Sequence, residues 1–162
     1  MGCGAGSGKK RIVVVGLGND TLGDDGVGLY VAREFKRRHP EVDAVEAPVG
    51  GLGLLDIVVG YDAAVVVDAL EGEKAGEVFV LTEKEAFGAA VAGCVHDCCF
   101  GTALEMGRRL GLSVPEKVVV VAVGVEDART FRDGLSKKVA AAVEKALRCV
   151  EEAVASFQRT ST

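Results

Sequence analysis

Short apolar runs that are rich in valine recur along this chain and restrict its fold more than any other feature. The run Ala63–Ala69 (AAVVVDA) is the most continuous, and Arg11–Val15 (RIVVV) and Lys117–Gly124 are of the same kind. A strand without polar alternation is buried on both faces, which is typical of parallel sheets covered by helices. The segments between these runs show helical periodicity, so the sequence predicts an α/β fold with a largely parallel sheet.

The remaining elements follow the same alternation. A shorter strand is predicted over residues 42–47, and Glu77–Thr82, in which polar and apolar residues alternate, is predicted to be a half-exposed edge strand. Apolar residues at helical spacing predict helices over residues 26–38, 51–59 and 97–110, and a last helix that Ser136 can cap. We expect a flexible leader over residues 1–10 and a single domain over residues 11–158.

Composition excludes several classes of protein. Hydrophobic residues make up 49% of the chain and charged residues 27%, which is typical of a globular protein. The net charge of -5 disfavours phosphate binding, so we expect no nucleic-acid partner. No apolar run approaches the length of a membrane span, so we expect no membrane partner. The start of the chain lacks the pattern of an export signal, and the odd number of cysteines shows no disulfide spacing, so we expect reduced thiols in a cytoplasmic protein.

The loop that follows the first strand, Gly16–Gly26 (GLGNDTLGDDG), is the first candidate for chemistry. A dinucleotide-binding loop needs a third glycine where this chain has Thr21, and its acids would repel a pyrophosphate. Asp24 and Asp25 could instead cap the next helix and interact favourably with its dipole. One acid is enough for that role, so the second acid remains available for other work.

Asp68 and His96 are further candidates, because Asp68 ends the valine run of a predicted strand, His96 follows another, and ligands collect at the carboxyl ends of parallel strands. A buried carboxylate at Asp68 is costly unless it is paired, hydrogen-bonded or bound to a metal, although it could also cap a neighbouring loop amide. His39 closes a helix, where a cation suits the dipole, so we expect it to be structural. One acid of the glycine loop, Asp68 and His96 together form an oxygen, oxygen and nitrogen ligand set that suits a borderline divalent ion such as zinc or nickel.

Cysteine chemistry is the competing interpretation of the same loop. Cys94, His96 and Cys98 could hold zinc or form a redox site, but their spacing is not CxxC and no second cysteine pair is present. Small buried thiols are the more ordinary explanation for Cys94, Cys98 and Cys99. The serine-hydrolase motif GxSxG is absent, which disfavours a serine nucleophile.

Several motifs resemble those of the hydrogenase maturation proteases, which process the large subunit of nickel-iron hydrogenases. The segment VVVGLGNDTLGDDGVGLYVAREF, at residues 13–35, is similar to the opening of that family. The strand VVVDAL and the histidine loop VHDCCFGTALEMG resemble its second and third motifs. The later segments VAVGVED and DGLS also fit, so the resemblance extends over nearly all of the chain from Arg11 onward.

The resemblance implies a three-layer α/β/α sandwich with a mixed five-stranded sheet in which one strand is antiparallel. It also implies that Asp25, Asp68 and His96 bind nickel, and these are the residues that the strand-end argument selects. The enzyme would be an endopeptidase that removes the C-terminal extension of a nickel-loaded hydrogenase large-subunit precursor. Nickel would then arrive with the precursor and act either in catalysis or as a recognition tag.

Two other function classes remain as alternatives to the peptidase. One is a non-enzymatic module that binds a nucleotide or flavin on a doubly wound sheet, which the acidic loop and the missing glycine disfavour. The other is the cysteine-based zinc or redox protein. The sequence leaves the oligomeric state open, and we expect a monomer.

Overall fold

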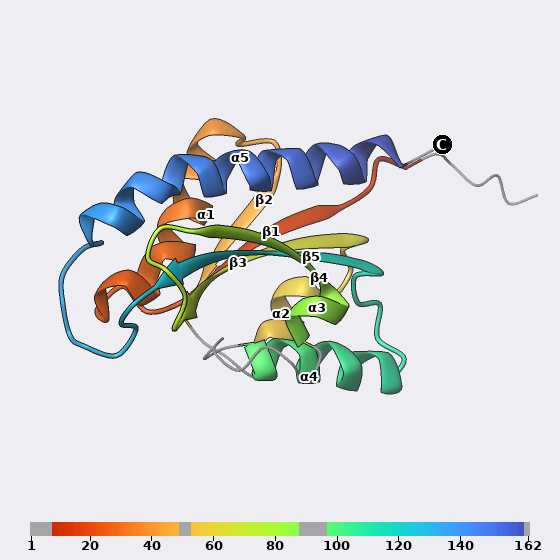
Figure 1. Ribbon diagram of the computed structural model, residues 1–162. Coiled ribbons are helices and arrows are strands. Elements are labelled where there is room, and N and C mark those ends of the chain that lie inside the picture. The colour runs from red at the N-terminus through yellow and green to blue at the C-terminus, as the bar shows by residue number, and fades with distance from the viewer. Residues whose placement is uncertain (1–7, 49–52, 88–96, 161–162) are drawn as a thin grey trace, which may run out of the picture.

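The computed structural model describes residues 8–48, 53–87 and 97–160, although the side chains of residues 97–99 are outside this description. Its centre is a five-stranded sheet with the order β2-β1-β3-β5-β4 (Figure 1). All neighbouring strands are parallel except β4, which runs antiparallel to β5 at one edge. The strands are β1 Ile12–Leu17, β2 Asp43–Ala47, β3 Ala63–Glu71, β4 Val78–Thr82 and β5 Lys117–Val125.

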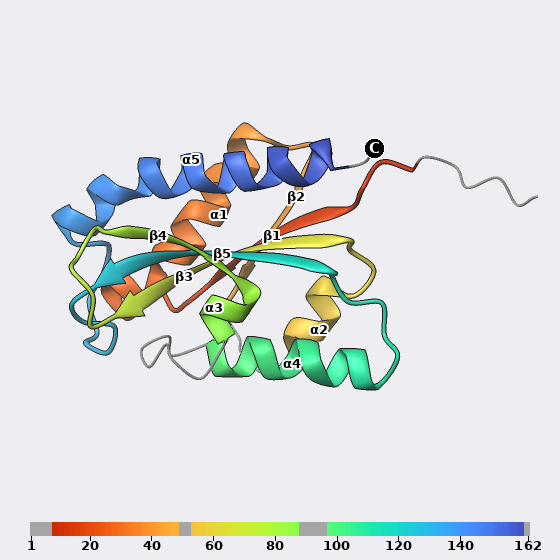
Figure 2. The same cartoon turned by 45° about the vertical axis from the view of Figure 1, so that its right-hand side comes forward.

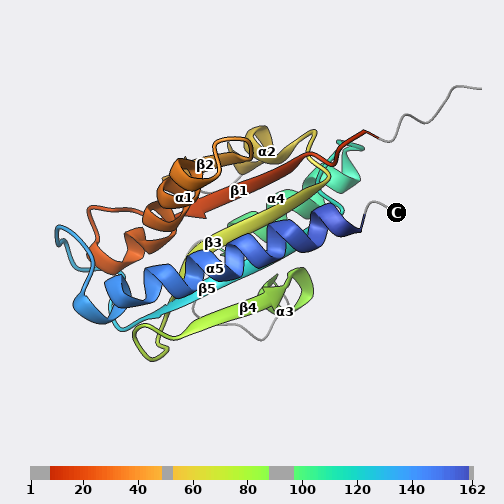
Figure 3. The same cartoon turned by 90° about the horizontal axis from the view of Figure 1, so that it is seen from above.

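Helices cover both faces of this sheet. Helices α1 (Val27–Arg38) and α5 (Lys137–Arg159) lie on one face, and α2 (Gly53–Val58), α3 (Glu83–Phe87) and α4 (Asp97–Arg109) lie on the other (Figures 1 and 2). Seen from above, α1 and α5 run side by side over the sheet (Figure 3). The predicted three-layer α/β/α sandwich with a mixed, mostly parallel sheet is therefore confirmed.

The valine-rich strands are apolar throughout because each face of the sheet has its own core. On β3, Val65 and Val67 belong to the core under α1 and α5, whereas Ala64 and Val66 belong to the core over α2 and α4. All four side chains are fully buried. Since a fully buried valine contributes about 1.5–3 kcal/mol, polar residues are not tolerated on either side of such a strand without compensation.

The predicted elements agree with the structure to within a few residues at their ends. The largest differences at a strand end are at β1 and β3, which continue two residues past their predicted ends to Leu17 and Glu71. Helix α3 has only five residues and was not predicted, because so short a segment carries no helical period. The predicted leader and the start of the predicted helix at 51–59 fall partly outside the described residues. Among the described helices, none has the length and apolar character needed to cross a membrane.

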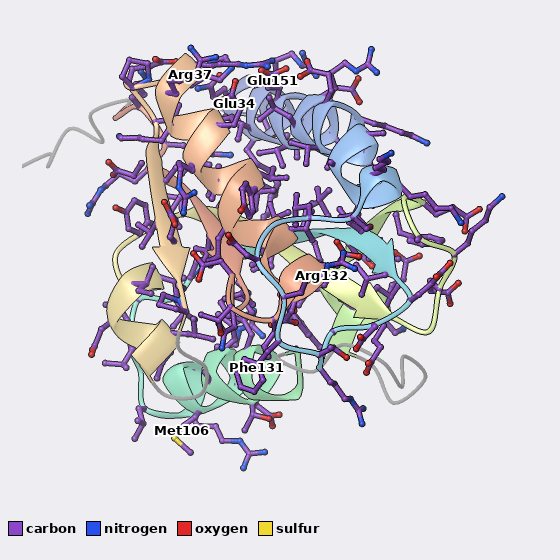
Figure 4. All side chains as sticks on the ribbon, turned by 90° about the vertical axis from the view of Figure 1, so that its left-hand side faces the viewer. Glu34, Arg37, Met106, Phe131, Arg132 and Glu151 are labelled. Carbon is purple, nitrogen blue, oxygen red and sulfur yellow. The ribbon has the colours of Figure 1, made fainter. Side chains whose placement is uncertain are left out.

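Ion pairs and one ring contact join the end of α1 to α5. Arg38 donates to Glu34 on its own helix and to Glu144 on α5. Hydrogen bonds from Arg37 and Arg38 lower the pKa of Glu34 to about 2. His39 lies 2.8 Å from Glu151 of α5 through Nε2 and its ring contacts Phe35, which is the structural role that the sequence predicts for it. Glu34, Arg37 and Glu151 mark this end of the molecule in Figure 4.

Gly28 allows α1 to touch the sheet with its main chain. A Cβ atom at this position would lie 2.3 Å from the carbonyl oxygen of Leu17 and 2.4 Å from that of Val67. Gly16 on β1 faces the same contact, because its Cβ would lie 2.2 Å from the Gly28 carbonyl oxygen. The first turn of α1 therefore packs directly against β1 at Leu17 and β3 at Val67. Neither Gly16 nor Gly28 has room for a side chain.

We expect Gly28→Ala to lower the free energy of unfolding by about 2 kcal/mol or more, because overpacking against main chain cannot relax. This loss would outweigh the gain of about 1 kcal/mol that alanine normally brings to a helix. Urea denaturation measures the change. The matched control is Gly107→Ala on α4, where the added Cβ meets the side-chain ends of Val114 and Leu55, which can shift. A Gly28→Ala protein as stable as wild type would contradict the close contact.

Candidate functional site

The candidate site lies where the order of the sheet reverses. Strand β1 leads through α1 to β2 on one side, while its other neighbour, β3, belongs to the half of the sheet that contains β5 and β4. The pairing of β1 with β3 ends at Gly16 and Val67, but β3 and β5 remain paired as far as Glu71 and Val125. In open α/β sheets, ligands bind outside the carboxyl ends of the strands at such a divergence, and we call this position in the sheet the crevice.

The loop after β1 folds back sharply and carries two buried acids. Gly18 has φ +140°, and a Cβ there would lie only 2.0 Å from the main-chain oxygen of Asp25. The chain then forms a short 3-10 helix, η1 (Gly23–Gly26), in which Asp24 is 7% and Asp25 is 2% exposed. Asp25 accepts a hydrogen bond of 2.9 Å at Oδ2 from the Asn19 N–H. The glycines of this motif therefore serve to bring Asp25 into the crevice.

Asp24 has a structural contact of its own. Its carboxylate accepts hydrogen bonds from the Ser136 N–H at 2.7 Å and the Ser136 hydroxyl at 2.8 Å, and Arg132 lies 3.6 Å away. Ser136 stands at the N-cap position of α5 but makes no side-chain capping bond to that helix. Asp24 therefore ties η1 to the start of α5.

The structure does not support the alternative in which Asp24 or Asp25 caps helix α1. The N-cap residue of α1 is Gly26, which has no side-chain capping bond. Asp24 is directed to Ser136 instead, and Asp25 to the loop amide of Asn19. Ser136 is the N-cap residue of α5, as the sequence predicts, but its side chain makes no capping bond because its hydroxyl donates to Asp24.

Asp68 is fully buried within β3, directly after the run Val65–Val67 and opposite Ala122 of β5. Its Oδ1 accepts a hydrogen bond of 2.8 Å from the Ala69 N–H. The expectation that Asp68 stands at the end of its strand is wrong, since β3 continues to Glu71. It is instead the first residue after the pairing with β1 ends, so it still borders the crevice.

Asp25 and Asp68 thus flank the same edge of the sheet. Gly28 lies close to the segments that carry both acids. Its main chain packs against Leu17, the last residue of β1, and against Val67, which directly precedes Asp68. Asp68 alternates with Ala64 and Val66 and so belongs to the face that α2 and α4 cover. The structure brings these two predicted residues to one edge, as parallel strands require.

His96, the third predicted ligand, lies outside the described residues, as does Cys94. Helix α4 begins at the next residue, Asp97, on the Asp68 side of the sheet and toward the end where β3 and β5 finish (Figure 2). Among the residues that the structure describes, no three His, Cys, Asp or Glu side chains are grouped to hold a metal ion. Carboxylate oxygens are donors of the kind that a borderline divalent ion accepts, and Asp25 and Asp68 are two buried carboxylates.

Sequence reasoning missed the segment between β5 and α5. Arg132 donates its N–H to the Thr21 carbonyl oxygen at 3.1 Å and accepts the Gly23 N–H at 2.9 Å, so this segment is bonded to the glycine loop. With Asp24, Ser136 and neighbouring residues it encloses a cavity of about 300 Å³. The apolar Phe131 in an otherwise polar stretch was the available signal. Figure 4 shows Phe131 and Arg132 on the face that looks toward the carboxyl ends of the strands.

Comparison with known proteins identifies relatives of this chain. The model of the HycI family, described as hydrogenase maturation protease, matches residues 29–153, a range that contains Asp68 and His96 and begins after Asp25. Protein FrxA from Pyrococcus furiosus is 28% identical over 134 residues, which are 80% of this chain and 94% of FrxA.

Solved structures give the same result. The hydrogenase maturating endopeptidase HybD from E. coli is 25% identical, with a TM-score of 0.77 over 91% of this chain and 93% of that one. The [NiFe] hydrogenase maturation protease HycI from Thermococcus kodakarensis is 27% identical, with a TM-score of 0.60 over 94% of this chain and 95% of its own.

The contact between Asp24 and Ser136 predicts a stability effect that separates Asp24 from Asp25. Asp24→Ala should lower the free energy of unfolding by about 1–3 kcal/mol, because two partly buried donors of Ser136 lose their acceptor. Asp24→Asn keeps an acceptor oxygen and should lose less. Urea denaturation gives both values, and Asp20→Ala, at an exposed acid of the same loop, should stay within about 0.5 kcal/mol of wild type. An Asp24→Ala protein with wild-type stability would contradict the structural role of Asp24.

Proposed function

This chain belongs to the hydrogenase maturation protease family, and on that basis we propose that it removes the C-terminal extension of a nickel-iron hydrogenase large-subunit precursor after nickel insertion. Its enzyme class is peptidase, as in its relatives HybD and HycI. The proposal concerns the substrate, the role of nickel and the residues that act on them. The partner is the nickel-loaded precursor.

One observation of the structure supports the proposal more than any other. Two buried carboxylates, Asp25 and Asp68, flank the crevice where β1 and β3 part, although burial of carboxylates is costly. Asp24, the adjacent acid, is already used to hold Ser136. Two carboxylates at such a place in a peptidase fold are suited to bind a cation that arrives with the substrate.

We propose that the cation is the nickel ion of the precursor and that Asp25, Asp68 and His96 bind it. Carboxylate oxygens and an imidazole nitrogen suit this borderline ion, and three protein ligands leave positions for groups of the precursor. A carboxylate that is shielded from water interacts strongly with a cation, because the local dielectric constant is low. Helix α4, which begins one residue after His96 in the sequence, covers the Asp68 face of the sheet, and this supports the set.

Two mechanisms use this set of residues. In one, the nickel that they hold polarises the scissile carbonyl group or activates the attacking water. In the other, the same contacts dock the cleavage site and one of the aspartates acts as general base toward water. In both mechanisms Asp25 and Asp68 hold the substrate through its metal, so loss of either carboxylate removes cleavage.

The nucleotide- or flavin-binding alternative has less support. The main chain at Gly28 is already in contact with Leu17 of β1 and Val67 of β3, so no space is left there for a phosphate. Asp24 and Asp25 lie directly before α1, where a pyrophosphate would need the N-terminus of the helix.

The ligand set predicts the effect of three substitutions on cleavage. Asp25→Asn, Asp68→Asn and His96→Ala should each lower the processing rate by more than about 100-fold, since loss of a ligand exceeds the usual effect of a residue that only supports one. A neutral amide is a much poorer ligand than a carboxylate, and alanine lacks the donor. The assay is the gel shift of the nickel-loaded precursor when it loses its extension, beside a thermal melt of each variant.

Asp24→Asn is the matched control for these variants, because it changes the neighbouring acid of η1 and should affect cleavage less than Asp25→Asn. Folded Asp68→Asn and His96→Ala proteins that process the precursor normally would refute the site assignment.

The cysteines give an independent prediction. Replacement of Cys94, Cys98 and Cys99 together by alanine should leave nickel-dependent processing within about a few-fold of wild type, because an oxygen and nitrogen ligand set needs no thiolate. Stability is expected to fall slightly if the thiols are packed. The same gel-shift assay measures the result. If the triple variant folds but does not cleave, the zinc or redox interpretation is favoured.

A further inference from the structure

Phe131 is exposed to an unusual degree for a large apolar residue. Its side chain is 83% accessible to water, more than any other large hydrophobic side chain among the described residues. It lies in the segment between β5 and α5 and is surrounded in sequence by Thr130, Arg132 and Asp133. A single exposed apolar residue needs no explanation by itself, so its setting decides what it means.

The segment that carries Phe131 is fixed by hydrogen bonds on both sides of it. The N–H and the carbonyl group of Arg132 both bond to the glycine loop, at Thr21 and Gly23. Asp127 accepts the N–H groups of Arg129 and Thr130, and its pKa lies below the usual value because the Thr130 side chain and the Arg129 N–H donate to it. Phe131 is therefore presented by a held backbone rather than by a loose loop.

Phe131 forms one wall of a cavity of about 500 Å³ between this segment and the glycine loop. Both aromatic rings and carboxylates line the cavity. Its lining residues are Asp20, Thr21, Tyr30, Phe131, Arg132 and Asp133. We call it the Phe131 cavity. Aromatic side chains surrounded by polar groups are typical of the residues that contribute most of the binding energy at protein interfaces.

The charge available to a ligand in this cavity is negative. Arg132 is the cationic member of the lining, and its guanidinium group lies 3.6 Å from Asp24. Arg33, which lies over the Tyr30 ring, is paired with Glu46 through hydrogen bonds of 2.9 and 2.7 Å. Asp20 and Asp133 are both exposed, so they are accessible to a cation from a partner.

We propose that the Phe131 cavity is a docking surface for the hydrogenase large-subunit precursor, and that it receives a segment with an apolar side chain next to a lysine or arginine. The apolar group would pack on Phe131, and the cation would lie between Asp20 and Asp133 near the aromatic rings. The inference rests on the proposed function, because it takes the precursor as the partner.

Continuity with the candidate site is the reason for this choice of partner. Asp20 and Thr21 belong to the same loop as Asp25, and Arg132 is bonded to that loop. A folded precursor whose cleavage site reaches Asp25 and Asp68 has to cover the surface beside them. The Phe131 cavity is that surface on the glycine-loop side.

The test is steady-state cleavage of the nickel-loaded precursors of the nickel-iron hydrogenases encoded in the same genome as this chain. Phe131→Ala should raise KM by about tenfold, as expected for an aromatic hot spot, and leave kcat unchanged. The matched control is Leu110→Ala, directly after the last residue of α4, where the side chain is 67% exposed, and it should leave KM unchanged. Thermal melts should be the same for both variants and for wild type.

The charges are tested separately with the double variant Asp20→Asn and Asp133→Asn. It should raise KM and weaken the increase of KM with salt concentration, because two attractive charges are lost. Asp56→Asn, at an exposed acid of α2, is the control and should change neither quantity.

The outcomes distinguish this inference from the proposed function. If wild type cleaves none of these precursors, the proposed function is wrong and the docking surface falls with it. If wild type cleaves one of them and Phe131→Ala has a wild-type KM, the docking surface alone is wrong. A folded Phe131→Ala protein with lower kcat at unchanged KM would also overturn docking, because it would place Phe131 in the chemical step.

Discussion

The main-chain contact between α1 and the sheet at Gly28 is the constraint on which the rest of the structure depends. A helix normally lies about 10 Å from a sheet because side chains separate the two layers. Here Gly16 and Gly28 remove those side chains, and the first turn of α1 touches the carbonyl groups of Leu17 and Val67. The chain therefore has to turn back within a few residues of β1, and η1 is forced into the crevice at the edge of the sheet.

This geometry gives adjacent acids different roles. In a 3-10 turn, successive side chains point in different directions, so Asp24 reaches Ser136 while Asp25 remains with the loop amide of Asn19. The ion pair of Arg132 and the two bonds to Ser136 make Asp24 part of the support of the site. A support of this kind keeps a functional group within a fraction of an ångström of its place, which ligand binding requires.

The same bonds extend the site into a surface. The segment between β5 and α5 is attached to the glycine loop through Arg132, so Phe131 and the proposed ligands are parts of one connected unit. A protease that acts on a folded precursor benefits from such a unit, because binding at a distance from the cleavage site positions the reacting bond. The peptidase family and this arrangement together explain why an apolar side chain stands exposed beside buried acids.

The sequence by itself determined the sandwich, since valine runs without polar alternation are stable only between two helical layers, and its motifs singled out Asp25, Asp68 and His96. Apart from the family resemblance, the residue pattern could not separate Asp24 from Asp25, because that distinction depends on Ser136, which is 112 positions away in the chain. It also placed Asp68 at the end of its strand, whereas pairing with β5 prolongs β3 to Glu71. Only the tertiary structure decides such points, because the contacts that fix them join residues that are distant in sequence and carry no local pattern.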